Sequence, residues 1–302
     1  MKNIDTIHIE LTDKCNLSCN YCYQKYLEQC DISNTDSFKE SELDIIRNSS
    51  VISVNFTGGE PTLYSSRLFT LAKAFSISGK NIVVTTNGLE RIESLEHINT
   101  IVVSLDGFFA EMNFNRNVNR HQYELIVDNI LYYLSNGVNV QLNIVITRYN
   151  LHQFGNFIKT NQFGNDVSYS VIVVSDKTVD KDYIVSDIDD YRFIANEILD
   201  IYKFFNYHIK LRSNLMTKSS FIDTFSKEFP ITFFTTYSVP TNKYRYVTNE
   251  FDGFDILCEN YHTISQIITE EIIKMLYNLN SDDWFNPYSW AELINEKISD
   301  EV

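Results

Sequence analysis

Three cysteines lie close together near the start of this 302-residue chain, in the segment Cys15-Asn-Leu-Ser-Cys-Asn-Tyr-Cys22. Their C-x3-C-x2-C spacing places three thiols on one short loop, directly after the strand-like run 4–11. Each iron of a cubane iron–sulfur cluster binds one thiolate, and four thiolates are usual. Three ligands would leave one iron open, and an open iron is a place for chemistry on a second molecule.

A zinc site is the alternative interpretation of this loop, with a fourth ligand from Cys30 or from a histidine. Zinc ligands usually come as two pairs that are well separated in the sequence. The chain has no second pair of this kind. The spacing therefore favours a cluster over zinc.

Short polar segments that contain glycine follow the next strand-like runs. They are Thr57-Gly58-Gly59-Glu60-Pro61, Thr85-Thr86-Asn87-Gly88 and Ser104-Leu105-Asp106-Gly107. In a barrel of parallel strands the active site lies at the carboxyl ends of the strands, and glycine lets the backbone approach a ligand closely. Ordinary turn chemistry also favours glycine after a strand. Three separate loops that each carry polar partners nevertheless favour a binding site.

The elements that must position these loops alternate regularly along the chain. The strand-like runs are 4–11, 51–56, 81–85, 100–105, 138–147 and 167–174. The helix-like stretches are 38–48, 66–78, 91–96, 121–135, 151–161 and 187–205. Such alternation predicts an α/β fold of repeated βαβ units around a parallel sheet.

Beyond about residue 206 the pattern changes. We expect a strand at 207–211, a hairpin at 244–258 with its turn at Asp252-Gly253, and helices at 263–279 and 289–298. No repeat or low-complexity linker separates this region from the rest. The sequence therefore predicts a C-terminal extension that packs on the barrel.

The cysteine spacing, with Tyr21 directly before the last cysteine, resembles the signature of the radical SAM superfamily. The resemblance covers about residues 5–205 and implies a partial (β/α)6 barrel in residues 1–205. Residues 206–302 would form a small α+β extension, similar to a degenerate SPASM or twitch hairpin plus helices. By the same resemblance Cys15, Cys19 and Cys22 bind one 4Fe–4S cluster, whose open iron is chelated by S-adenosylmethionine (SAM).

The resemblance also implies where SAM binds. The positions that match the family's SAM-binding residues are Tyr21, Gly58, Gly59, Glu60, Asn87, Ser104, Asp106, Arg116 and Asn143. Tyr21 would help to hold the adenine, and Glu60 would complement the ammonium group of SAM. Ser104 and Asp106 would reach the ribose hydroxyls. Arg116 would bind the carboxylate; Arg120 is a rival for this role, and either could be a solvated surface arginine.

The resemblance implies reductive cleavage of SAM to methionine and a 5′-deoxyadenosyl radical, which abstracts hydrogen from a substrate. The sequences of the motifs are similar to those of the branch that modifies ribosomally made peptides, the RiPP maturases. A precursor peptide is therefore the expected substrate, with a cross-link or an epimerised residue as the product. A small-molecule substrate, or a module that binds SAM and cluster without turnover, is the alternative.

Many enzymes of that branch hold auxiliary clusters in a C-terminal extension. Outside the signature loop only Cys30 and Cys258 remain, too few to ligate a second cluster fully by cysteine, so we expect a single cluster. Cys258 is either a hydrogen donor in an epimerisation or a buried apolar thiol. Because the first cysteine is residue 15, we expect no leader-binding domain before the barrel. Leader binding would then fall to the extension or to a separate leader-binding protein.

Composition narrows the class of protein further. The formal net charge of −15 argues against nucleic acid as a partner, although an acidic surface could attract a basic peptide. The chain shows no signal peptide and no run that could span a bilayer. Five cysteines, three of them in one loop, indicate a reducing cytoplasm. There a reductase, a flavodoxin or a ferredoxin would be the expected electron donor.

Overall fold

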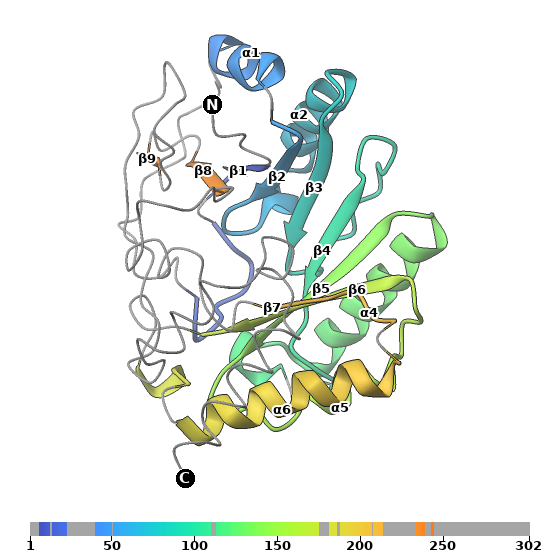
Figure 1. Cartoon of the computed structure of the whole chain (residues 1–302). Helices are drawn as coiled ribbons and strands as arrows, with labels where there is room; N and C mark the ends of the chain where they lie inside the picture. The colour runs from blue at the N-terminus through green and yellow to red at the C-terminus, as the bar shows by residue number, and fades with distance from the viewer. Residues whose placement is uncertain are drawn as a thin grey trace, which may run out of the picture.

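The computed structural model describes residues 6–12, 14–22, 40–49, 51–109, 113–174, 181–185, 188–206, 208–213, 234–238 and 243–244. Its centre is a curved sheet with the strand order β7-β6-β5-β4-β3-β2-β1-β8-β9 (Figure 1). The strands are β1 (Thr6–Glu10), β2 (Ser53–Thr57), β3 (Asn81–Thr86), β4 (Thr100–Ser104), β5 (Asn139–Ile146), β6 (Val167–Val173), β7 (Leu211–Ser213), β8 (Phe234–Ser238) and β9 (Lys243–Tyr244). Every neighbouring pair is parallel except β8 and β9.

Helices follow β1, β2, β4, β5 and β6 in the chain and pack on one face of the sheet (Figure 1). They are α1 (Glu40–Asn48), α2 (Ser65–Ile77), α4 (Arg120–Ser135), α5 (Phe154–Thr160) and α6 (Ile188–Phe204), with short 3-10 turns η3 (Pro61–Tyr64), η4 (Phe114–Arg116) and η5 (Lys181–Tyr183). The sequence predicts these five helices to within a few residues. The expected partial (β/α)6 arrangement of β1 to β6 is confirmed.

The two faces of the sheet differ in chemistry because side chains alternate along each strand. On β5, for example, Val140, Leu142, Ile144 and Ile146 are buried, while the residues between them are only partly buried or exposed. The buried set joins side chains of the helices in one hydrophobic core. The opposite face, which we call the inner face, carries hydroxyl and amide side chains on most strands.

Helix α4 shows how local sequence fixes one of these elements. Asn119 and Gln122 form a capping box at its start, in which each side chain binds the backbone N–H of the other residue. Its buried residues Tyr123, Ile126, Ile130 and Tyr133 recur at three- and four-residue spacing. The stripe packs this helix onto the sheet, beside the loop that carries Asp106.

The expected short helix at 91–96 is wrong. Residues 91–95 have no regular structure, and Ile92 and Ile98 are nevertheless buried. Two hydrogen bonds to α4 hold this irregular segment: Arg91 Nε donates to Asn129 Oδ1 at 2.8 Å, and the N–H of Ile92 donates to the hydroxyl of Tyr133 at 3.0 Å.

The region beyond residue 206 adds strands at both edges of the sheet. Strand β7 pairs with β6, and β8 pairs with β1 from Thr6↔Phe234 to Glu10↔Ser238. The strand expected at 207–211 starts only at Leu211. The hairpin expected at 244–258 and the helices at 263–279 and 289–298 lie outside the described residues, as do Cys30 and Cys258.

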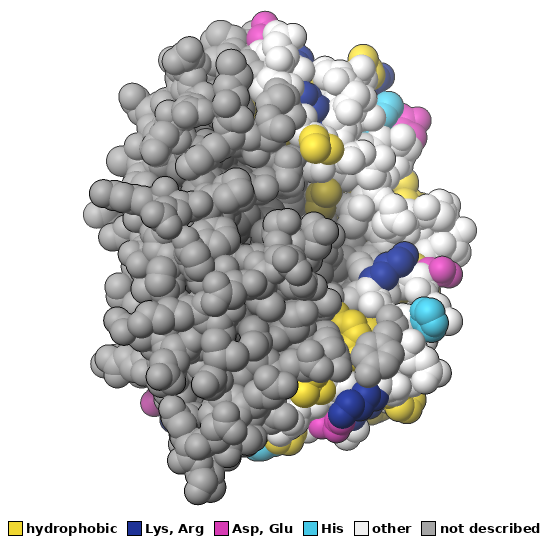
Figure 2. All heavy atoms as spheres, in the orientation of Figure 1, with side chains coloured by type: hydrophobic (Ala, Val, Ile, Leu, Met, Phe, Trp, Pro, Cys, Tyr) yellow, Lys and Arg dark blue, Asp and Glu magenta, His cyan; other side chains and the backbone are white. Residues whose placement is uncertain are grey.

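Two surface features bear on the class of protein. Among the described residues no helix is both long enough and apolar enough to cross a bilayer. On the described part of the face shown in Figure 2, Lys and Arg side chains are scattered and do not gather into a basic patch.

Candidate functional site

The predicted site residues lie where β1 to β5 end and their loops begin. Because these strands are parallel, their carboxyl ends meet at one edge of the sheet. Glu10 at the end of β1 is in register with Thr57 of β2, and Ser104 at the end of β4 is in register with Asn143 of β5. The loops that carry the cysteines, Glu60, Asn87 and Asp106 therefore start from one edge.

The cysteine loop presents two thiols, those of Cys15 and Cys19, whose pKa values lie above the ordinary value for cysteine. Cys15 is exposed, whereas Cys19 and Cys22 are partly buried, and the N–H of Cys22 donates to the carbonyl of Cys19 at 3.2 Å. Burial is the main cause that raises the pKa of Cys15 and raises that of Cys19, the latter to about 11, and neighbouring thiols contribute to both shifts. Metal binding at this loop must therefore displace protons.

Turn η4 supports the cysteine loop from the β4 side. The N–H of Asn20 donates to the carbonyl of Asn115 at 2.7 Å, and the Sγ of Cys19 lies 3.8 Å from the carbonyl oxygen of Arg116. Asn117, in a left-handed conformation, reaches the carbonyl of Ser18 through its amide. These contacts fix the loop around Cys19 to the barrel.

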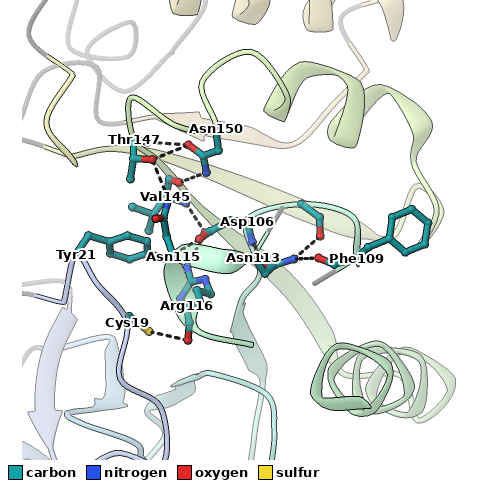
Figure 3. A network of polar contacts seen from close by, with 11 residues as sticks. Cys19, Tyr21, Asp106, Phe109, Asn113, Asn115, Arg116, Val145, Thr147 and Asn150 are labelled. Carbon is teal, nitrogen blue, oxygen red and sulfur yellow. Dashed lines mark hydrogen bonds and ion pairs between the residues drawn. The ribbon is translucent and has the colours of Figure 1, made fainter. Parts of the chain in front are cut away.

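A second network anchors η4 itself. The Asn115 amide donates to the Thr147 hydroxyl at 3.1 Å, and the N–H of Thr147 donates to Asn150 at 2.7 Å (Figure 3). Asn113, fully buried, accepts from the N–H of Asp106 and donates to two carbonyls of its own loop. Turn η4 is thus tied to the ends of both β4 and β5.

Gly58 lets the loop after β2 touch the start of the cysteine loop. Its φ is +129°, and a Cβ atom here would lie 2.3 Å from the carbonyl oxygen of Thr12. The N–H groups of Gly59 and Glu60 donate to the carbonyls of Thr12 and Lys14 at 2.6 and 2.8 Å. Only glycine fits this contact without displacing the backbone that leads into the cysteines.

Glu60 is fully buried and joins the loop after β2 to the end of β3. Its Oε1 accepts from the N–H and hydroxyl of Thr62 and from the hydroxyl of Thr86, at 3.1, 2.7 and 2.7 Å. Its Oε2 accepts from the N–H of Asn87 at 2.7 Å. Burial raises its pKa, although these hydrogen bonds oppose the shift. The observed hydrogen bonds show that Glu60 holds the two loops together. Its expected contact with the SAM ammonium group remains a prediction.

Asn87 connects β3 to the cysteine loop. Its amide nitrogen donates to Asn16 Oδ1 at 2.7 Å and lies 3.8 Å from the Sγ of Cys15. Its amide oxygen accepts from the N–H of Leu89, which fixes the orientation of the side chain. The structure therefore brings Asn87 to the first cysteine, and its contact with SAM stays a prediction.

Asp106 lies at the centre of a buried cluster (Figure 3). Its Oδ2 accepts from the hydroxyl of Tyr21 at 2.6 Å, and its Oδ1 accepts from Arg116 Nη2 at 2.7 Å and from the N–H of Val145 at 2.9 Å. Asp106, Arg116 and Tyr21 are only 1%, 5% and 8% exposed. The carboxylate is occupied by donors of this chain, so its contact with a ribose remains a prediction.

Arg116 is the arginine that the structure places at this site. Arg120 lies on the outside of α4, where it pairs with Glu124 at 3.0 Å. Burial alone would lower the pKa of Arg116, but Asp106 and Tyr21 outweigh it, so the pKa is raised and the guanidinium stays charged. Its Nε is buried without a hydrogen-bond partner, a donor still available to an anionic group.

Ser104 and Asn143 are neighbours on the inner face. Both are partly buried, and Gln141 donates to Asn143 Oδ1 at 3.0 Å. The structure thus gathers all nine predicted SAM-site positions and the three cysteines at one edge of the sheet. It does not describe Cys258.

The donor set fits an iron–sulfur cluster and SAM. Among the described residues no three His, Cys, Asp or Glu side chains converge on one metal ion. A cubane takes each thiolate on a different iron, so it suits thiols that are spread along a loop, whereas one zinc ion needs its ligands to converge. The unpartnered Nε–H of Arg116 is free to donate a hydrogen bond to a carboxylate such as that of SAM.

A comparison with known families agrees with this geometry. The profile of the Radical SAM superfamily matches residues 9–160, which include all three cysteines and the loops that follow β2 to β5. The chain belongs to the radical SAM superfamily. Enzymes of this family use a 4Fe–4S cluster and SAM, so both expected cofactors are confirmed.

Two curated relatives of this radical SAM protein carry names that describe nucleotide chemistry. It is 30% identical over 169 residues to an S-adenosylmethionine-dependent nucleotide dehydratase of Fibrobacter sp. (strain UWH6), covering 50% of this chain and 51% of that one. It is 31% identical over 144 residues to a GTP 3′,8-cyclase of Clostridium acetobutylicum, covering 43% of each chain. The chain thus spans about half the length of the curated relatives it matches.

Solved structures with the same fold include SuiB of Streptococcus suis bound to S-adenosylmethionine. The TM-score is 0.61 at 18% identity, over 78% of this chain and 59% of that one. The protein anSMEcpe with bound AdoMet gives a TM-score of 0.52 at 19% identity, over 68% of this chain and 64% of that one. At such identities the likeness shows the fold.

Several residues that build the site were not predicted from the sequence. They are Asn113, Asn115, Asn117, Thr147 and Asn150. Asparagine is frequent throughout this chain, so a local group of asparagines does not distinguish a binding site from the rest of the sequence. The run Asn-Phe-Asn-Arg-Asn after the fourth strand was the one available signal, because polar residues at a strand's carboxyl end point to a site.

Proposed function

We propose that this radical SAM enzyme abstracts a hydrogen atom from a ribosomally made peptide, leading to a cross-link or an epimerised residue. When bound, the reduced cluster and SAM supply the 5′-deoxyadenosyl radical that takes this hydrogen. The residues of this chain hold the reactants: the cysteines bind the cluster, and the loops after β2 to β5 orient SAM. The reacting atoms must lie within about 3–3.5 Å of one another.

The observation that carries the peptide proposal is the chemistry of the inner face. On β3 to β6 its polar members are neutral hydroxyls and amides, including Thr85, Gln141, Asn143, Ser168 and Ser170. Strands β1 to β6 contain no Lys or Arg; the basic residues of the described sheet lie in β7 and β9. Neutral hydrogen-bond donors and acceptors suit the N–H and C=O groups of a peptide, whereas binding of a triphosphate calls for several Lys or Arg side chains.

A nucleotide is the second candidate substrate. The curated relatives named above support it, because they act on GTP or on other nucleotides and share about 30% identity with this chain. Their similarity covers about half of each protein.

Partners and the product type are further parts of the proposal. We propose a precursor peptide as substrate, a separate leader-binding protein or the region beyond residue 206 as its docking element, and a reductase, flavodoxin or ferredoxin as electron donor. In an epimerisation Cys258 would return the hydrogen atom. A Cys258→Ala variant that forms product at the full rate would remove that role.

The deciding experiment follows deuterium into 5′-deoxyadenosine. The anaerobically reconstituted chain is mixed with SAM and dithionite, and either a deuterated peptide encoded beside its gene or deuterated GTP is added. Deuterium transfer from the peptide supports the proposal, whereas transfer from GTP replaces it with the second candidate. A Cys15→Ala variant serves as the control for cluster-dependent chemistry.

A further inference from the structure

The Asp106–Arg116 pair places two opposite charges in the interior beside the cysteine loop. Arg116 Nη2 lies 2.7 Å from Asp106 Oδ1, and the two side chains are only 6% and 0% exposed. The charges are therefore shielded little by solvent or salt. Each of them alone would act strongly on any neighbouring charge, and together they largely cancel.

The pair touches the cysteine loop at two points. Asp106 holds the hydroxyl of Tyr21, the residue before Cys22, at 2.6 Å, and the carbonyl oxygen of Arg116 lies 3.8 Å from Cys19 Sγ. The Arg116 guanidinium also lies 5.4 Å from the centre of the Tyr21 ring. Cys19 thus contacts the backbone of Arg116, and the residue before Cys22 contacts the charged side chains of both Asp106 and Arg116.

The surroundings make these charges effective. Tyr21 packs with Val174 and Ile184 in a small apolar cluster that also contacts Cys19. Few solvent dipoles can reorient in such a place, so charges interact more strongly than they do at the surface. The potential of an iron–sulfur cluster depends on nearby charge, on hydrogen bonds and on solvent exposure.

We propose that the buried Asp106–Arg116 pair, tied to the cysteine loop through Tyr21, sets the reduction potential of the cluster. Reduction adds one electron to the cluster, from the 2+ to the 1+ state, and changes no bond. A nearby cation stabilises the added negative charge and a nearby anion opposes it. The two residues therefore shift the potential in opposite directions, and their balance decides how readily the cluster accepts an electron.

The test measures the cluster's midpoint potential in the anaerobically reconstituted full chain. Dithionite supplies the electrons, mediators poise the potential, and electron paramagnetic resonance reports the reduced cluster. We expect Arg116→Gln to lower the midpoint and Asp106→Asn to raise it. The double variant should return close to the wild-type value, because it restores a neutral pair.

Two further variants complete the design. Arg120→Gln removes an arginine of equal charge from an exposed position and should leave the midpoint unchanged, because its charge is screened. Tyr21→Phe removes one donor from the Asp106 carboxylate and keeps the ring. It should lower the midpoint by less than Arg116→Gln does, since the anion is then less well neutralised.

Iron content and the thermal unfolding of the metal-free protein establish that each variant folds and loads. Midpoints that move in the same direction for Asp106→Asn and Arg116→Gln, or that stay fixed in fully loaded protein, overturn the proposal. If Asp106→Asn or Arg116→Gln fails to hold a cluster, the midpoint potential of Tyr21→Phe decides whether the proposal holds. A downward shift supports the proposal, and no shift or an upward shift rejects it.

Discussion

Glu60 offers the sharpest test of whether the site is braced by the protein before any cofactor binds. Its carboxylate accepts four hydrogen bonds from Thr62, Thr86 and Asn87, and the side chain is fully buried. A Glu60→Gln variant keeps the shape but replaces one acceptor oxygen by an NH2 group. The least costly orientation leaves that NH2 facing the N–H of Asn87, donor against donor.

The magnitude follows from these contacts. One hydrogen bond to a charged group contributes about 1.5–3 kcal/mol, and an unsatisfied buried N–H costs about 1–3 kcal/mol. Relief from burying a charge offsets part of this loss, because burial raises the pKa of Glu60. We expect a net loss of about 2 kcal/mol in the free energy of unfolding.

The assay is urea unfolding of the metal-free protein without SAM, under anaerobic conditions. Glu90→Gln, at an exposed position in the next loop, is the matched control and should change stability by less than about 0.5 kcal/mol. A Glu60→Gln variant as stable as the control, but weaker in binding SAM, would refute the bracing role. It would leave Glu60 as a ligand contact only.

Three further predictions concern the same region. Gly58→Ala should lower the free energy of unfolding by more than the roughly 1–3 kcal/mol of backbone strain alone and should lower the iron bound per chain, because the new Cβ meets the carbonyl oxygen of Thr12. The control is Gly79→Ala, which is also at positive φ but has nothing within 4 Å of the new Cβ. Equal losses of stability and iron in both variants would contradict the reasoning. Burial lowers the pKa of His8 to about 4, so the folded state binds its proton less tightly than the unfolded state does. The metal-free protein should lose up to about 3 kcal/mol of stability as the pH falls from about 6.5 to 4, and His8→Gln should reduce that slope in urea titrations while exposed His121→Gln should not. Iron analysis of the reconstituted chain should give about four irons, and about eight would reveal an auxiliary cluster.

The sequence is enough to predict the cofactor and the architecture. The cysteine spacing is local, so it needs no fold to be recognised, and Cys15, Cys19 and Cys22 specify a cluster loop by themselves. The alternation of strands and helices is likewise periodic within each element, and five of the six helices expected before residue 206 appear close to their predicted bounds. The expected helix at 91–96 is absent from a segment that Asn129 and Tyr133 of α4 hold by hydrogen bonds, and such contacts are not encoded in a local periodicity.

The partners of the site residues could be found only in the tertiary structure. Tyr21 and Asp106 are 85 residues apart in the chain, and Glu60 and Asn87 are 27 apart. Such pairs depend on strand register and on the path of each loop, which no local pattern encodes. The sequence by itself therefore determined the superfamily, the fold class and the two cofactors, and it named the candidate residues for binding them. The folded chain decided how their charges are paired, because that pairing requires side chains from several strand ends to meet in one buried place.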